Sequence, residues 1–533
     1  MSNQLSFLDN FLVLIYFAMV LFIGLIVSKN KDKNIKEYFL AGKNLGWFAI
    51  GMSLFATNIS SEHLVGLAGA GSIYGLSVGY FEWYAVIILI FLGWFIAPIF
   101  IKANVFTVPQ YFGKRFDDKS RLYLTIVSIF VYLVVKIGVT ILAGSFVLSE
   151  VLGWNMLATS ILIVLLTGLY TVIGGLNSVV YTQIFQTVLI ILGAVLLSVF
   201  GLFEIGGFST LSENLSAEYF SIIKSSSDSA FPWTGILLGA PILGIWYWCA
   251  DQYIVQRILG AKNIQEARKG TLLAAFLKII PIFFIIFPGL VVAVLYPSLK
   301  GDSAYSLLLS GNILPIGIKG LVIIGFLSAI MSSLSSSFNS AASLFALDIY
   351  GLFKPNTSEN EIVLVGRLTT MFFVITTIAL IPLLRNINNH IYINIQALQA
   401  FIAPPIVSVF LIGIFWKKAS SKGAIWALTI GGTLGLLKIA LLFIDEVWIN
   451  TYIFLKIFYK INYLHFAIFL FLLSSTVIIS FSLFKVKEKY EGQNDNILDI
   501  SNKGDDVRFS SPANNYFSKE VKINKTKVKS FTN

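Results

Sequence analysis

The chain has 533 residues, of which 57% are apolar and only 12% are charged, and its mean hydropathy is +0.83. Roughly a quarter of the residues of a soluble protein are charged, so this composition excludes an ordinary soluble domain. The single cysteine, Cys249, excludes an intramolecular disulfide, and three scattered histidines argue against a zinc or haem site.

Thirteen stretches are apolar and long enough to span a bilayer, which takes roughly 20 residues each. They lie near residues 11–28, 45–70, 77–101, 122–148, 156–174, 179–203, 232–256, 270–297, 316–347, 362–384, 391–416, 423–444 and 463–484. The sequence therefore predicts an all-α polytopic protein with about 13 transmembrane helices, located in the plasma or inner membrane.

The basic residues of the loops define the orientation of these spans. Loops on one side of the membrane carry 18 Lys and Arg residues, and those on the other side carry 6. The positive-inside rule places the richer side in the cytoplasm, with the N-terminus outside and the C-terminus inside. This bias, together with a polar, Lys-rich tail at 485–533 that we expect to be disordered, accounts for the net charge of +11 without a nucleic-acid partner.

Two polar stretches interrupt the apolar spans. The first, LFATNISSEHLVG at 54–66, has five polar or charged residues among six consecutive positions, and the second is GIWYWCADQ at 244–252. An unsatisfied polar group in hydrocarbon costs several kcal/mol, so such stretches predict broken helices that line a cavity. Because they lie five spans apart, two consecutive five-span units have opposite orientations, which is typical of inverted-repeat transporters.

Five ionisable residues lie inside spans: Glu62, Glu82, Lys136, Asp251 and Lys278. Such residues are costly in a membrane and are candidates for function. For Lys136 the residue pattern favours snorkelling or a structural pair. For the deeper Glu62, Glu82 and Lys278, pairing within the bundle and a role in binding are both open.

A span rich in serine, SAIMSSLSSSFNSAASLF at 328–345, allows two interpretations. Small residues favour close helix packing, which explains most of these serines. Alternatively, the hydroxyls of Ser332 and Ser333 offer oxygen ligands to a hard cation such as Na⁺, together with carbonyls freed at the break near 56–60.

Several segments of the chain resemble the sodium/solute symporter family, in particular its sodium/glucose cotransporter branch. They occur in the family's order across residues 5–485 and include EYFLAGKNLGWFAIGMSLFATNISSEHLVGLAGAG (37–71), GYFEW (79–83), YTVIGGLNSVVYT (170–182), WYWCADQYIVQR (246–257), FLKIIPIF (276–283), MSSLSSSFNSAASLFALDIY (331–350) and PPIVSVFLIGIFWKK (404–418). The resemblance implies sodium-driven uptake on a LeuT-like core, an inverted five-helix repeat with extra helices. It also implies the division of the chain into an N-terminal helix and loop, two repeats, two additional helices and a polar tail, at residues 1–44, 45–203, 204–420, 421–486 and 487–533.

The resemblance also assigns site residues by position. The family's sodium site falls on Ala56, Ile59, Ala329, Ser332 and Ser333. The sugar site falls on Asn58, His63, Glu82, Tyr247, Trp248, Lys278 and Gln396, whose side chains offer donors and acceptors to sugar hydroxyls. The outer hydrophobic gate falls on Leu67, Phe81 and Tyr392.

Three positions depart from the family's pattern. Gly244 and Ala85 stand where the branch has polar contacts to the sugar, which leaves the identity of the sugar open. Gln183 replaces an aspartate that many members carry and that is linked to a further cation or proton, although Ser335 and Ser336 keep hydroxyls nearby. The resemblance therefore implies one sodium per sugar.

The sequence predicts a sodium-coupled symporter for a neutral sugar of the glucose or galactose type, working by alternating access. Its expected partners are the sugar, Na⁺ and the lipid bilayer, with no nucleic acid and no obligate protein partner. The alternatives are a symporter of the same fold for myo-inositol, an amino acid, a vitamin or an anion, and a membrane sugar sensor that does not transport. An enzyme is disfavoured because no nucleophile–base set or metal cluster is visible.

Overall fold

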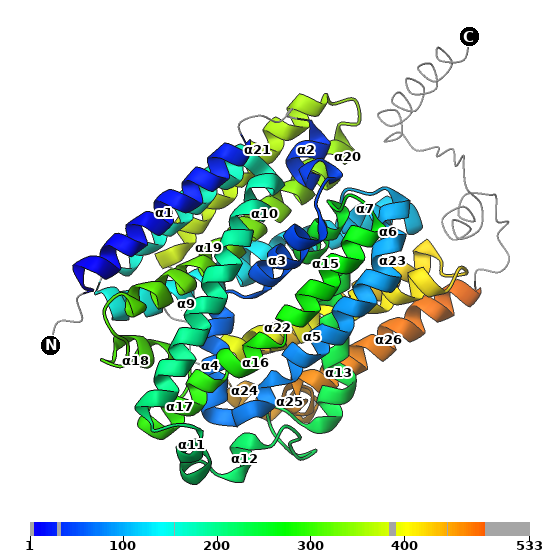
Figure 1. The fold of residues 1–533 in the computed structure, drawn as a ribbon. Coiled ribbons are helices and arrows are strands. Elements are labelled where there is room, and N and C mark those ends of the chain that lie inside the picture. The colour runs from blue at the N-terminus through cyan, green and yellow to red at the C-terminus, as the bar shows by residue number, and fades with distance from the viewer. Residues whose placement is uncertain (1–4, 29–33, 154, 383–390, 445, 485–533) are drawn as a thin grey trace.

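The structure, a computed structural model, describes residues 5–28, 34–153, 155–382, 391–444 and 446–484. Within these ranges the chain forms helices and no β-strand (Figure 1). The predicted tail and the basic residues at 29–33 lie outside the described residues.

The helices up to residue 204 contain the first predicted repeat. They are α1 (Phe7–Ser28), α2 (Ile35–Leu40), α3 (Trp47–Asn58), α4 (Ser61–Tyr74), α5 (Tyr80–Phe91), α6 (Ala97–Ala103), α7 (Val108–Arg115), α8 (Asp118–Phe130), α9 (Gly138–Leu152) and α10 (Met156–Glu204). Short 3₁₀ or π turns connect some of them: η1 (Ala41–Lys43), η2 (Gly75–Gly79), η3 (Leu92–Ile96) and η4 (Val131–Ile137).

The remaining helices contain the second predicted repeat and the additional helices. They are α11 (Phe208–Asn214), α12 (Ala217–Phe220), α13 (Trp233–Ile245), α14 (Gln252–Leu259), α15 (Ile264–Leu277), α16 (Ile280–Phe284), α17 (Phe287–Leu295), α18 (Ala304–Ser310), α19 (Ile318–Leu344), α20 (Gly351–Phe353), α21 (Glu359–Leu380), α22 (Ile391–Phe415), α23 (Ser421–Leu441), α24 (Glu446–Thr451), α25 (Ile453–Lys460) and α26 (Tyr463–Phe484). Two π turns, η5 (Trp246–Ala250) and η6 (Phe345–Tyr350), follow α13 and α19.

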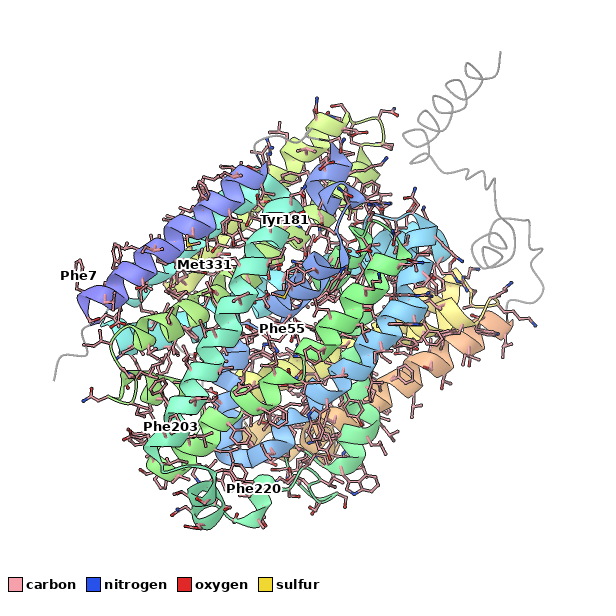
Figure 2. All side chains as sticks on the ribbon, viewed as in Figure 1. Phe7, Phe55, Tyr181, Phe203, Phe220 and Met331 are labelled. Carbon is pink, nitrogen blue, oxygen red and sulfur yellow. The ribbon has the colours of Figure 1, made fainter. Side chains whose placement is uncertain are left out.

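Apolar side chains cover the outside of the bundle as well as its interior. Phe7 and Phe203 are 87% and 75% exposed, whereas Phe55 and Met331 are buried (Figure 2). Eleven continuous helical segments among the described residues are long and apolar enough to cross a membrane. These features confirm a polytopic, all-helical membrane protein.

Two of the eleven segments are about twice as long as one crossing requires. Ser61–Ala103 and Met156–Glu204 have 43 and 49 residues, or about 65 and 74 Å at about 1.5 Å per residue, roughly twice the hydrocarbon thickness of a bilayer. Gly75 and Gly175, both with positive φ, divide these two segments. Both glycines lie between spans that the sequence predicts. The total of thirteen transmembrane helices and the orientation of the termini remain predictions.

Gly175 shows why the chain can turn within α10. Its φ of 55° and ψ of −145° lie in a region that favours glycine, and a Cβ atom there would lie 2.3 Å from the carbonyl oxygen of Tyr38. The α2 segment therefore packs closely against the bend, at the short loop that the sequence predicts between the spans at 156–174 and 179–203.

Both polar stretches are breaks between helices. After α3 ends, Ile59 and Ser60 have extended backbones, and α4 begins at Ser61. After α13 and η5, Asp251 is extended, and α14 begins at Gln252. The predicted helix breaks in 54–66 and 244–252 are confirmed.

Helix α1, outside the predicted repeats, is fixed to α19, which carries the serine-rich sequence. The buried carboxylate of Asp9 accepts hydrogen bonds from the backbone N–H groups of Gly317 and Gly320, at 2.9 and 2.8 Å. A carboxylate at a helix N-terminus satisfies otherwise unpaired N–H groups and interacts favourably with the helix dipole. Asp9 thus helps to hold in place the helix that contains Ser332 and Ser333.

Candidate functional site

The two helix breaks are joined by direct hydrogen bonds. Asn58, the last residue of α3, donates from Nδ2 to the Tyr247 hydroxyl at 3.1 Å. The hydroxyl of Tyr253 donates to the carbonyl of Thr57 at 2.6 Å. Carbonyls near the end of α3 lack their usual helical partners, and side chains from the second break satisfy one of them.

The serine pair of α19 lies against the end of α3. Ser332 Oγ is 2.8 Å from the carbonyl oxygen of Ala56 and 3.1 Å from that of Ala329, and Ser333 Oγ is 3.4 Å from the carbonyl oxygen of Thr57. Five oxygens, all in buried residues, therefore lie where α3 and α19 meet. Oxygen ligands of this kind suit a hard cation. The Ile59 carbonyl belongs to the extended break beside them.

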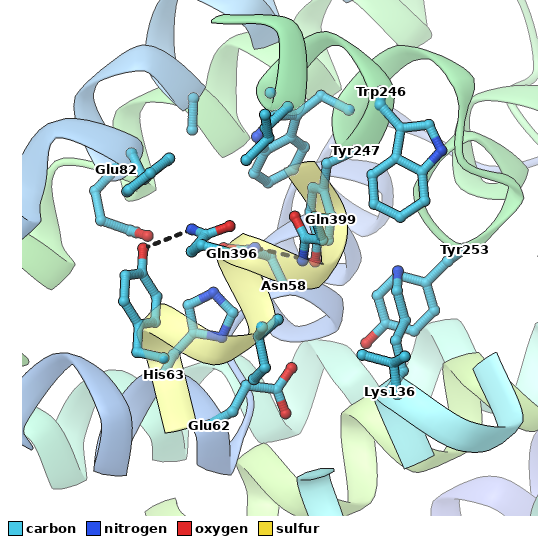
Figure 3. Close-up of a pocket in the computed structure, with 18 of the residues that line it drawn as sticks. Asn58, Glu62, His63, Glu82, Lys136, Trp246, Tyr247, Tyr253, Gln396 and Gln399 are labelled. Atoms are coloured by element: carbon cyan, nitrogen blue, oxygen red, sulfur yellow. Dashed lines mark hydrogen bonds between the residues drawn. The ribbon is translucent and has the colours of Figure 1, made fainter. Parts of the chain in front are cut away.

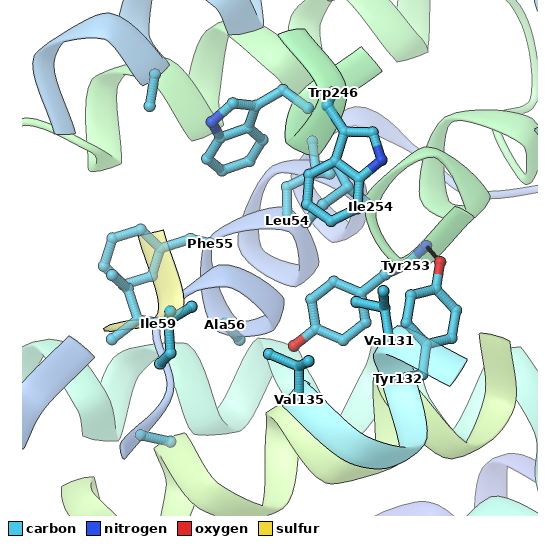
Figure 4. Close-up of a cluster of buried hydrophobic side chains, with 14 of the residues drawn as sticks. Leu54, Phe55, Ala56, Ile59, Val131, Tyr132, Val135, Trp246, Tyr253 and Ile254 are labelled. Atoms are coloured by element: carbon cyan, nitrogen blue, oxygen red, sulfur yellow. Dashed lines mark hydrogen bonds between the residues drawn. The ribbon is translucent and has the colours of Figure 1, made fainter. Parts of the chain in front are cut away.

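Hydrophobic side chains enclose this group of oxygens. Ala56 and Ile59 belong to a cluster of buried residues that also contains Phe55, Val135 and Tyr253 (Figure 4). These residues are at most 7% exposed, so the surroundings of the oxygens are largely apolar. Low polarity around an oxygen cage strengthens its attraction for a cation.

A cavity of about 70 Å³ lies beside the breaks, enough for roughly five water molecules (Figure 3). All seven predicted sugar-site residues and two of the three gate residues line it: Asn58, His63, Glu82, Tyr247, Trp248, Lys278, Gln396, Phe81 and Tyr392. The third gate residue, Leu67, is fully buried and does not line the cavity. The structure therefore gathers residues that span more than 300 positions of the sequence.

A buried ion pair organises one end of the cavity. The Lys278 ammonium donates to the carboxylate of Glu82 and to Oδ1 of Asn58. Lys278 and Glu82 are 1% and 3% exposed, and each provides the counter-charge for the other within an apolar bundle. With the Asn58–Tyr247 bond, this makes a continuous chain of polar groups from α5 to the second break.

Aromatic rings and an amide close another part of the cavity. The ring centroids of Phe81 and His63 each lie 6.1 Å from that of Tyr392. Gln396, one turn after Tyr392 in α22, donates to its hydroxyl at 3.1 Å. The predicted gate residue Tyr392 is thus in contact with two predicted sugar ligands, His63 and Gln396, and with the second gate residue, Phe81.

Lys136 forms the structural ion pair that the sequence favours. Its ammonium lies 2.6 Å from the carboxylate of Asp251, which also accepts from the Tyr132 hydroxyl and caps α14. Glu62, by contrast, accepts from the Thr140 hydroxyl at 2.7 Å and, within the described chain, forms no ion pair.

The sequence interpretation missed Gln399 as a cavity residue, although it lies one turn after Gln396 within an apolar helix. That spacing places both amides on the same face of α22, so it was a usable signal. Trp246 and Tyr253 also line the cavity, and both belong to the quoted segment WYWCADQYIVQR.

With this geometry established, comparison with known proteins identifies the family. The model of the sodium:solute symporter family matches residues 38–431, which is most of the chain. The chain belongs to the sodium:solute symporter family. The predicted resemblance is confirmed.

Relatives of this symporter include three cotransporters of similar sequence. The sodium/myo-inositol cotransporter of Homo sapiens is 36% identical over 490 residues, covering 83% of this chain and 68% of the relative. Sodium/glucose cotransporter 4 of Mus musculus is 36% identical over 473 residues (82% and 69%), and sodium/glucose cotransporter 1 of Oryctolagus cuniculus is 35% identical over 526 residues (89% and 78%). These relatives are transporters, so this multi-pass membrane protein is a symporter rather than an enzyme, and Na⁺ is its co-transported ion.

A solved structure supports the fold. A Na⁺-coupled sialic acid symporter in a substrate-bound, outward-open state superposes with a TM-score of 0.77 at 24% identity, covering 90% of this chain and 98% of that one. At this identity the likeness concerns the fold alone, and it agrees with the predicted inverted-repeat architecture.

In this symporter, the side-chain amide of Gln183 makes hydrogen bonds with both its oxygen and its nitrogen. Gln183 Oε1 accepts from the hydroxyls of Ser53 and Thr57 at 2.5 and 3.3 Å, and Nε2 donates to Ser336 Oγ at 2.6 Å and to the Ser332 carbonyl at 2.9 Å. The fully buried guanidinium of Arg257 reaches the same Ser336 hydroxyl at 2.5 Å. At the position where the family resemblance implies an aspartate in many members, this chain has the fully hydrogen-bonded amide of Gln183, with the positive charge of Arg257 nearby.

At position 244, a side chain would require the end of the Ile88 side chain to move. A Cβ atom on Gly244 would lie 2.3 Å from Cδ1 of Ile88, which reaches across from α5. An apolar group therefore occupies the place of the polar contact that the branch has there. Ala85, the other departure, lies one turn before Ile88 and also lines the cavity.

Proposed function

We propose that the chain imports a neutral sugar or polyol together with one Na⁺ by alternating access. The observation that carries this proposal is the chain of buried polar groups from Glu82 through Lys278 and Asn58 to Tyr247. Carboxylate, ammonium, amide and phenol together present donors and acceptors at fixed positions, which suits the several hydroxyls of a sugar ring.

The charge of the cavity favours a neutral solute over an anion. Both lysines at the cavity, Lys136 and Lys278, are already paired with carboxylates. Glu62 adds a carboxylate without a direct ion-pair partner among the described residues. Among the described residues, the cavity therefore offers an anionic substrate no lysine or arginine side chain that is free of a carboxylate partner.

We propose that Na⁺ binds between the broken helix and α19, to the carbonyls of Ala56, Ile59 and Ala329 and the hydroxyls of Ser332 and Ser333. Several of these oxygens already lie within hydrogen-bond distance of one another. Bound Na⁺ would fix the end of α3, which carries Asn58 only two residues after Ala56. Sodium and sugar then stabilise the same arrangement, which is the differential affinity that coupling requires.

The amide of Gln183 and the charge of Arg257 support a ratio of one sodium per sugar. A second cation in that region would find a guanidinium instead of a carboxylate. A sugar of the glucose or galactose type and myo-inositol are both candidate substrates. Because the apolar side chain of Ile88 lies beside Gly244, where the branch has a polar contact to the sugar, we expect the protein to discriminate weakly between substrates that differ in the hydroxyl at that contact.

Uptake into proteoliposomes tests the proposal. Radiolabelled glucose, galactose and myo-inositol are offered separately, with an inward Na⁺ gradient or with K⁺ replacing Na⁺. We expect at least one of the three to enter faster with Na⁺ than without it, and no uptake into liposomes that lack the protein. Sodium-independent binding without uptake would support a sugar sensor, and no response to any of the three would refute the sugar assignment.

A further inference from the structure

A groove on the outside of the bundle differs from the cavity at the helix breaks because its lining is almost entirely apolar. It has a volume of about 720 Å³ and forms where α15 packs against α3 and α5 (Figure 1). Its walls are the exposed apolar side chains of Trp47, Ile90, Leu272, Phe276 and Ile279. In a membrane protein such a surface faces lipid.

The length of the groove matches one leaflet of a bilayer. Its lining runs from Lys269 in α15 to Ile279, two residues beyond the end of that helix. Ten residues of helix rise by about 15 Å, which is about half of the hydrocarbon thickness. The groove therefore has room for an acyl chain of one leaflet, from its head end to near the midplane.

A cationic side chain stands at the head end of the groove, and a second cationic residue adjoins it in the sequence. Lys269 is exposed and lines it, and Arg268 precedes Lys269 at the start of α15. Trp47, at the start of α3, is 42% exposed, and tryptophan is enriched at the level of lipid headgroups. This end therefore lies at the membrane surface on the side that carries most loop Lys and Arg residues.

The cationic groups have no carboxylate partner in the described part of the chain. The Arg268 guanidinium packs over the ring of Trp94 at 5.8 Å, and its buried Nε has no hydrogen-bond partner. The nearest carboxylate along the helix, that of Glu266, accepts instead from the backbone N–H of Trp47 at 2.6 Å. Arg268 and Lys269 are thus positioned to receive an anion.

We propose that this groove binds an anionic phospholipid from the leaflet on the Lys- and Arg-rich side, which the positive-inside rule makes the cytoplasmic leaflet. The phosphate lies against Arg268 and Lys269, since guanidinium and ammonium groups donate strongly to phosphate oxygens. One acyl chain lies along Leu272, Phe276 and Ile279. Basic pockets between transmembrane helices on the cytoplasmic side bind lipid headgroups in this way.

Native mass spectrometry of the purified full chain tests the proposal. Phosphatidylglycerol and phosphatidylcholine with identical acyl chains are titrated against the wild-type protein and two double variants. R268Q/K269Q removes the proposed phosphate contacts. K418Q/K422Q makes the same charge change at two exposed residues where α22 connects to α23, on the same side of the membrane by the positive-inside rule.

We expect phosphatidylglycerol to bind the wild type and the K418Q/K422Q control at least tenfold more tightly than phosphatidylcholine. In R268Q/K269Q this preference should fall roughly tenfold or more, since each basic residue near an anionic surface contributes about a factor of five. Equal affinity for the two lipids in the wild type, or an undiminished preference in R268Q/K269Q, would overturn the proposal.

Two further measurements separate the lipid from a simpler anion and guard against misfolding. Glycerol phosphate, which has the anionic head without acyl chains, should not displace bound phosphatidylglycerol; displacement would overturn the acyl groove. Leu272→Trp fills the groove at a side chain that is 50% exposed, so the fold is retained. It should weaken phosphatidylglycerol binding without changing any charge, and unchanged binding would contradict the placement.

Discussion

The ion pair between Glu82 and Lys278 allows the proposed sugar site to be tested in a defined way. Glu82→Ala removes a carboxylate that lies 3% exposed and holds the ammonium of Lys278. A hydrogen bond to a charged group contributes about 1.5–3 kcal/mol. Losing one such bond to a sugar hydroxyl should weaken sugar affinity by roughly 10- to 150-fold, because about 1.4 kcal/mol is a factor of ten.

The same substitution also leaves Lys278 as a buried charge with Asn58 as its remaining hydrogen-bond partner. Breaking a buried ion pair from one side costs about 3–5 kcal/mol of stability, so Glu82→Ala alone confounds binding with folding. The double variant E82A/K278M removes both charges and replaces the ammonium with an apolar side chain of similar length. We expect it to fold better than E82A and still to bind sugar at least tenfold more weakly than the wild type.

Equilibrium binding of a labelled transported sugar to purified, monodisperse protein in Na⁺ buffer is the assay. The matched control is E361A/K354M, which removes a Lys–Glu pair whose nitrogen and oxygen are 2.6 Å apart at the exposed end of α21. It should bind sugar as the wild type does. Wild-type affinity in E82A/K278M would refute the reasoning, because the sugar would then bind without either member of the pair.

The other predictions concern the sodium site and the shape of the cavity. Ser333→Ala should abolish sodium-dependent uptake, while Ser343→Ala, whose hydroxyl bonds only within its own helix, should not; sodium dependence that survives Ser333→Ala would mean that the ion binds elsewhere. Gln396→Ala should lower sugar affinity about tenfold in the same binding assay, with little change in apparent sodium affinity without sugar; an unchanged sugar affinity would remove Gln396 from the site. Gly244→Thr should lower uptake because its Cβ meets Ile88, and adding Ile88→Ala should restore it, since overpacking costs about 1–3 kcal/mol; failure of the second substitution to help would contradict the steric explanation.

The breaks in the helices were predictable because their cause is local. Five polar or charged side chains within Asn58–His63 cannot be satisfied inside a continuous lipid-facing helix, whichever neighbours the chain has. The same holds for the turn at Gly175, where the sequence predicted a short loop between two spans and the structure has positive φ. Local chemistry is sufficient for such features.

The partners of the buried charges were not predictable in the same way. The sequence marked Lys136 and Asp251 separately, but they lie 115 positions apart and meet only once η4 packs near the second break. The hydrogen bonds among Gln183, Arg257 and Ser336 likewise join three helices. Spacing along one chain carries no information about such contacts, because they depend on how the helices pack.

Accumulation against a gradient tests sodium-coupled sugar import most directly. A tenfold inward Na⁺ gradient at zero membrane potential stores about 1.4 kcal/mol per ion. With one Na⁺ per sugar, proteoliposomes should therefore accumulate the labelled sugar up to about tenfold over the external concentration, and the accumulation should collapse when the gradient is dissipated with a sodium ionophore. An internal concentration that never exceeds the external one would contradict coupling, and accumulation approaching a hundredfold would contradict the one-to-one ratio.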